Sequence, residues 1–164
     1  MISYNTLMTA TAHALVAGAI AAKFSDPTTA SILALSSHYI MDSIPHWDFG
    51  TNWRMRSKTF TGTLAVFETV FGIGISYALF GSSASFITFS AAIVASLLPD
   101  WIETPWYIFF AHAKKNGPSL RASVWEKLTH QAYKIQNKFH TKAQFPFGLV
   151  TQVATVFFFI FLLR

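Results

Sequence analysis

Five long apolar runs constrain the fold of this chain more than any other feature. They cover residues 5–24, 27–47, 59–80, 83–103 and 145–163, and each approaches the roughly 20 apolar residues with which an α-helix crosses a bilayer. Only 12% of the 164 residues are charged, whereas about a quarter are charged in a typical soluble domain. The sequence therefore predicts an all-α integral membrane protein with about five transmembrane helices.

The runs divide this single membrane domain into three parts. Residues 5–110 contain the first four runs and predict a four-helix core, built as two tandem helical hairpins. Residues 112–143 form a basic segment without a long apolar run, and residues 145–163 predict the fifth transmembrane helix.

The basic residues predict how these helices are oriented. Ten of the 12 lysines and arginines lie in the connections after the second and fourth runs, whereas Lys23 and Arg164 fall on the opposite side. Because cytoplasmic loops carry the excess of Lys and Arg, the N-terminus is predicted to be cytoplasmic and the C-terminus external, in a plasma (inner) membrane. Anionic lipid headgroups account for the net charge of +5, so no nucleic-acid partner is expected.

The 112–143 segment has the pattern of an amphipathic helix. Apolar residues recur at three- and four-residue spacing and lysines occupy the positions between them, in the order Leu120, Val124, Lys127, Leu128, Lys134, Ile135, Lys138 and Phe139. The segment is predicted to lie on the cytoplasmic membrane surface in contact with anionic headgroups. The alternative is a solvated helical hairpin. Two histidines of the segment, His130 and His140, are interpreted as surface residues.

Acidic residues are concentrated in the apolar runs. Five of the seven lie within or at the ends of predicted spans: Asp42, Asp48, Glu68, Asp100 and Glu103. An aspartate at the centre of a membrane helix costs roughly 2.5–3.5 kcal/mol, so such residues usually face a bundle interior and mark a functional site. The alternative is a structural role between helices. For Asp48, pairing with Arg54 and Arg56 is an equally good explanation.

The stretch "SSHYIMDSIPHWD" (36–48) suggests what this site binds. It spaces His38, Asp42 and His46 by four residues, which would place all three on one helical face. Two such side chains one turn apart can chelate a metal ion. The chain has no cysteine, and imidazole with carboxylate suits zinc best here, with manganese or iron possible.

A short internal repeat extends the candidate site. "IPHWDF" (44–49) aligns with "LPDWIE" (98–103), and His13 precedes Pro45 by 32 residues as Glu68 precedes Pro99 by 31. Two parallel hairpins related by a pseudo-two-fold axis would bring these residues to one depth and one polar cavity. The predicted metal ligands are His13, His38, Asp42, His46 and Asp100, and the candidate general bases are Glu68 and Glu103.

These motifs resemble those of the small prokaryotic membrane-bound metal-dependent hydrolases. "SSHYIMDSIPHWD" and "SLLPDWIE" are similar to the H-x-x-x-D and L-P-D-x-[DE] elements of that family, and "AHALVAGAIAAK" is similar to its N-terminal histidine–glycine helix. The resemblance implies an inner-membrane protein with metal ligands at His13, His38, Asp42 and Asp100. The family's H-R-G-x-T-H-S element is missing, and here the H-x-x-x-D element precedes the L-P-D element.

Three classes of function fit the sequence. The first is a metal-dependent hydrolase that acts on a phospholipid or another amphiphilic ester or phosphoester near the cytoplasmic leaflet. The second is a protein that handles protons or cations through a relay of histidines and carboxylates. The third is a non-catalytic membrane scaffold with a structural metal.

Overall fold

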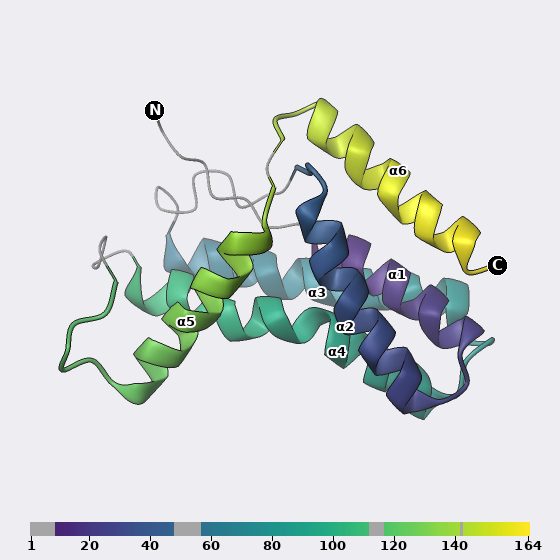
Figure 1. The fold of residues 1–164 in the computed structure, drawn as a ribbon, viewed down its shortest axis with the longest axis horizontal. Helices are drawn as coiled ribbons and strands as arrows, with labels where there is room; N and C mark the ends of the chain where they lie inside the picture. Colours follow the sequence, from purple (N-terminus) through teal and green to yellow (C-terminus); the bar gives the residue numbers. More distant parts are fainter. Residues whose placement is uncertain (1–8, 48–56, 112–116, 142) are drawn as a thin grey trace.

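The computed structural model describes residues 9–47, 57–111, 117–141 and 143–164. The regular secondary structure of these residues is helical, apart from an isolated β-bridge at His46. The elements in chain order are α1 (Ala10–Lys23), α2 (Pro27–Ser43), α3 (Lys58–Phe80), α4 (Phe86–Pro105), a turn of π-helix (Trp106–Phe110), α5 (Val124–Phe139) and α6 (Phe147–Leu162) (Figure 1). The prediction of an all-α protein is confirmed. The prediction for Asp48 concerns a residue outside the described ranges.

Local sequence signals set where α2 begins and ends. The Asp26 carboxylate caps the helix by accepting a hydrogen bond from the Thr29 N–H at 2.7 Å. The helix ends at Ser43, because Pro45 has no N–H to donate and disfavours helical backbone at the residue before it. His46 therefore lies beyond the helix, and the prediction that it shares one helical face with the two ligands before it was wrong.

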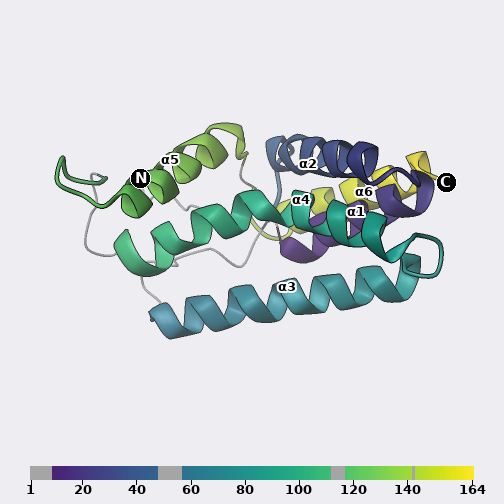
Figure 2. The ribbon, with the colours of Figure 1, turned by 90° about the horizontal axis from the view of Figure 1, so that it is seen from below.

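Helix α1 lies at the centre of the bundle. It packs against α2, α3, α4 and α6, and Figure 2 shows α3 on one side of it and α2 on the other. At one end of α1 the Lys23 ammonium donates to the Arg164 carbonyl at 2.8 Å, and at the other the Gln152 amide donates to Thr9 Oγ1 at 2.6 Å. Helices α1 and α6 therefore run in the same direction.

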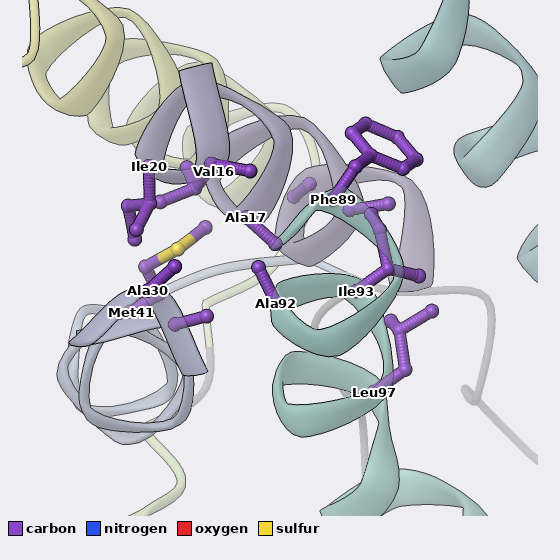
Figure 3. Close-up of a cluster of buried hydrophobic side chains, with 13 residues drawn as sticks. Val16, Ala17, Ile20, Ala30, Met41, Phe89, Ala92, Ile93 and Leu97 are labelled. Carbon is purple, nitrogen blue, oxygen red and sulfur yellow. The ribbon is translucent and has the colours of Figure 1, made fainter. Parts of the chain in front are cut away.

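The core between α1, α2 and α4 consists mainly of small side chains. Figure 3 shows Ala17 of α1 facing Ala92 of α4, while Met41 of α2 extends toward α1. Contacts between α1 and α3 are closer still: Ser76 Oγ donates to the Ala14 carbonyl at 2.7 Å, and a Cβ built on Gly72 would lie 2.7 Å from Thr11 Cα. Small residues that let helix backbones approach are typical of helix contacts in membranes.

The two predicted hairpins differ in their surroundings. Helix α1 buries nine residues, whereas α3 buries two, Gly72 and Ser76. His13 therefore lies in a central helix and Glu68 in a peripheral one. Any symmetry between the hairpins does not extend to the burial of their first helices.

Two helices of the described chain are long and apolar enough to cross a membrane. They are α3 (Lys58–Phe80) and α4 together with the π-helical turn (Phe86–Phe110), while α1 and α6 are apolar but shorter. Large apolar side chains are exposed along α3 and α6, among them Phe67, Val70, Phe71, Phe157, Phe158 and Phe161. Such a surface suits contact with lipid.

Candidate metal centre

Asp42 is the centre of a buried cluster of histidines. Its Oδ1 lies 3.2 Å from His13 Nε2, and its Oδ2 lies 3.3 Å from His38 Nε2. All three side chains are fully buried. Helix α2 supplies the aspartate and the histidine one turn before it, and α1 supplies the third side chain from across the core. The predicted convergence of these three residues is therefore present in the structure.

The distances suit ligands around a shared ion. Ligand atoms at the corners of a tetrahedron with metal bonds of 2.0–2.1 Å are about 3.3 Å apart, whereas charged hydrogen bonds are typically about 2.7–2.9 Å long. Among the described residues, neither His13 Nε2 nor either oxygen of Asp42 has a hydrogen-bond partner. A buried polar atom without a partner costs about 1–3 kcal/mol, and a divalent cation would satisfy all three atoms. The cluster can thus hold a metal ion.

A second group of ligand atoms shares Asp42 with the first. His140 Nδ1 lies 3.3 Å from Asp42 Oδ2, and His140 Nε2 lies 3.2 Å from His46 Nε2. His46 Nδ1 lies 2.7 Å from the Ile44 carbonyl. Because a carbonyl only accepts, His46 carries its proton on Nδ1 and presents the lone pair of Nε2 to the cluster. This group, too, can hold a metal ion.

Backbone pairing fixes the second group. The Thr141 N–H donates to the Asp42 carbonyl at 3.0 Å, and the Ala143 N–H donates to the His46 carbonyl at 3.0 Å. The segment after α5 is therefore bound along the segment after α2. A Cβ built on Gly148 would lie 2.6 Å from the Trp47 nitrogen, so only glycine lets α6 begin this close to the ligand segment.

Asp100 and Gln136 border the first group. Asp100 Oδ1 lies 3.8 Å from His38 Nε2. The Gln136 amide nitrogen lies 2.9 Å from the same imidazole nitrogen and donates to Asp100 Oδ1 at 3.2 Å. The Asp100 side chain is 13% exposed, whereas the Asp42 and His38 side chains are fully buried. Asp100 is therefore placed where solvent or a substrate can reach the cluster.

Glu68 contacts a different part of α1. Its carboxylate lies beside Thr9, Ala10 and Thr11, and its Oε1 has no hydrogen-bond partner among the described residues. It therefore lies near the N-terminus of α1, where the first N–H groups have no partner within the helix. Glu68 belongs to neither group of ligand atoms, and its predicted role as a general base stays a prediction.

Glu103 is fully buried on α4, one turn after Asp100. It belongs to neither group of ligand atoms among the described residues. Its predicted role as a general base stays a prediction.

His140 and Gln136 are the site residues that sequence reasoning missed. Both belong to one polar stripe on α5 and its C-terminal end, formed by Glu126, Thr129, Tyr133, Gln136 and His140. The spacing of three and four residues was visible in the sequence. However, the spacing alone does not show which element this stripe contacts.

Comparison of the chain with protein-family models, curated proteins and solved structures found no match. The geometry of the described residues therefore carries the functional argument.

Proposed function

We propose that this protein is a membrane-embedded, metal-dependent hydrolase of a phospholipid or another amphiphilic ester or phosphoester. The observation that carries the proposal is the Asp42 carboxylate, which is fully buried with both oxygens turned toward histidine nitrogens at 3.2–3.3 Å. A buried carboxylate needs a compensating cation. Imidazole and carboxylate together favour zinc, with manganese or iron as alternatives.

The residues around the cluster suit hydrolysis. A divalent ion held by His13, His38 and Asp42 would lower the pKa of a bound water and polarise a phosphoryl or carbonyl oxygen. Asp100 lies at the solvent-accessible side of this group and is positioned to accept a proton from a water there. Gln136 orients Asp100 by donating a hydrogen bond from its amide nitrogen.

A chelator experiment tests the function. Protein purified without chelator is expected to contain divalent metal and to hydrolyse phospholipid in mixed micelles. Chelation should abolish both, and added zinc or manganese should restore both. Protein without bound metal would overturn the proposal. Metal-dependent cation flux into vesicles without hydrolysis would instead support the cation-handling alternative.

The proposed topology has five helices across the plasma membrane. In the described chain α1, α3 and α6 run in one direction and α2 and α4 in the other, as five alternating spans require. The metal cluster then lies in the cytoplasmic half, beside the basic loops. The N-terminus is cytoplasmic and the C-terminus is external.

Cysteine labelling is expected to confirm this orientation. The chain has no cysteine, so Ser82→Cys, between α3 and α4, and Ser119→Cys, before α5, each provide a single thiol. A membrane-impermeant maleimide should label Ser82→Cys in intact cells and Ser119→Cys only after lysis. The reverse pattern would invert the topology, and equal labelling would place both loops on one side.

Helix α5 is proposed to lie on the cytoplasmic membrane surface. Its polar stripe faces the protein, where Glu126, Thr129 and Gln136 are buried. The exposed remainder carries an apolar face beside a basic one, formed by Val124, Trp125, Leu128, Ile135 and Phe139 and by Lys127, Lys134 and Lys138. An apolar face flanked by lysines suits the boundary between acyl chains and anionic headgroups.

Spin labels on α5 are expected to separate lipid contact from solvation. Labels at Leu128→Cys and Ile135→Cys in anionic vesicles should be accessible to oxygen, which dissolves in lipid, and shielded from an aqueous nickel complex. Labels at Lys127→Cys and Lys134→Cys should show the opposite order. Equal accessibility of all four to nickel would favour the solvated hairpin.

A further inference from the structure

We propose that the cluster binds two metal ions, bridged by Asp42, with His46 and His140 holding the second ion. This inference deepens the proposed function and rests on it for the first ion, which His13 and His38 hold on the other side of Asp42. In the described residues the two groups of ligand atoms share Asp42 alone. A carboxylate has about four lone-pair sites on its two oxygens, so one aspartate can serve two ions.

The placement of the two histidine side chains favours a cation between them. His46 Nε2 presents a lone pair to the cluster, because its Nδ1 proton is donated to the Ile44 carbonyl. A neutral His140 has a single proton for two partners, the Asp42 carboxylate at 3.3 Å and His46 Nε2 at 3.2 Å. If Nδ1 of His140 carries the proton, the lone pair of its Nε2 faces the lone pair of His46 Nε2. If Nε2 carries the proton, the lone pair of Nδ1 faces a lone pair of the Asp42 carboxylate. A metal ion or an additional proton between these atoms would remove this repulsion.

A metal ion fits this position better than a second proton on His140. The Nε2 atoms of His46 and His140 are separated by 3.2 Å, close to the roughly 3.3 Å between two nitrogens on one zinc ion. Asp42 would supply a further ligand of this ion. The Ile44 carbonyl would fix the tautomer of His46, as partners of metal-binding histidines usually do.

Hydrogen bonds also hold the ligand segments of the second group in place. Backbone hydrogen bonds join Thr141 to Asp42 and Ala143 to His46, so the two histidines are held side by side before any ion binds. Thr151 of α6 donates its hydroxyl to the Pro45 carbonyl and fixes the same segment from the other side. Rigid elements that hold ligands in place favour a specific site.

The chemistry of such a pair points to phosphoesters. Two-metal sites hold their ions about 3.5–4 Å apart and bind both the attacking and the leaving oxygen of an in-line displacement at phosphorus. Of the substrates proposed above, phospholipids and other lipid phosphoesters therefore fit a paired centre better than carboxylic esters do.

Metal content and electron paramagnetic resonance test the inference. Full-length protein is stripped with chelator and reloaded with Mn²⁺, and bound manganese is counted per chain. The wild type should bind two ions and give an exchange-coupled spectrum. His46→Ala and His140→Ala should each bind one ion and give the hyperfine pattern of an isolated ion.

His130→Ala is the matched control, because His130 lies on α5 about 15 Å from His140 along the helix direction. It should keep two coupled ions. A single ion in the wild type that survives in His46→Ala and His140→Ala would overturn the paired centre and leave the proposed function standing. A single ion that these variants lose would overturn the paired centre as well. No bound ion in any protein would overturn both proposals.

Discussion

Asp42→Asn is expected to remove all bound metal and, with it, hydrolysis. The substitution keeps the shape of the side chain but replaces the shared carboxylate by an amide, whose NH₂ group would point at histidine nitrogens or at the ions. Loss of a neighbour that only orients a ligand weakens metal binding about 10–100-fold. Loss of a carboxylate that contacts both groups should therefore weaken it by more than about 100-fold.

Thermal unfolding separates a lost site from a lost fold. Wild-type protein should unfold at a higher temperature when zinc or manganese is added, because only the folded state holds the ion. Asp42→Asn should lose this increase. Without metal it should be at least as stable as the wild type, because it no longer buries an uncompensated charge. Asp26→Asn is the control: it alters the exposed cap of α2 and should keep the metal-dependent increase. A metal-stabilised Asp42→Asn would contradict the assigned site.

The helices were predictable because long apolar runs in the sequence mark their positions. The predicted runs at 59–80 and 145–163 nearly coincide with α3 and α6. The pairing of His38 with Asp42 could also be predicted from the sequence, since four residues make about one helical turn. The four-residue spacing predicts His46 on the same helix, but Pro45 ends α2 at Ser43, before the spacing reaches His46.

Contacts that depend on rotation around a helix could not be predicted. Spacing gives the depth of a residue in a membrane helix, but a shift of one residue turns its side chain by about 100°. His13 and Glu68 were predicted at one depth. In the structure His13 faces α2, whereas the Glu68 carboxylate contacts the first turn of α1. His140 joins a site about a hundred residues earlier in the chain, through packing that no local pattern records.

The close contact between α1 and α3 predicts that alanine substitutions at two glycines of α3 affect thermal stability in opposite directions. A Cβ on Gly72 would lie 2.7 Å from Thr11 Cα, which is backbone and cannot turn aside. Gly72→Ala must therefore separate the helices and strain the hydrogen bond from Ser76 to the Ala14 carbonyl. Overpacking of this kind costs about 1–3 kcal/mol.

Gly74→Ala should act in the other direction. A Cβ on Gly74 would meet no atom within 4 Å, and alanine is favoured over glycine in a helix by up to about 1 kcal/mol. In thermal unfolding of metal-free protein in detergent, Gly72→Ala should lower the midpoint and Gly74→Ala should leave it equal or raise it. Gly72→Ala should also weaken metal binding, because Thr11 lies two residues before the ligand His13 and moves with it. Equal midpoints for the two variants would show that α1 and α3 do not approach as closely as Gly72 permits. The contact at Gly72 would then not be what holds His13 in position.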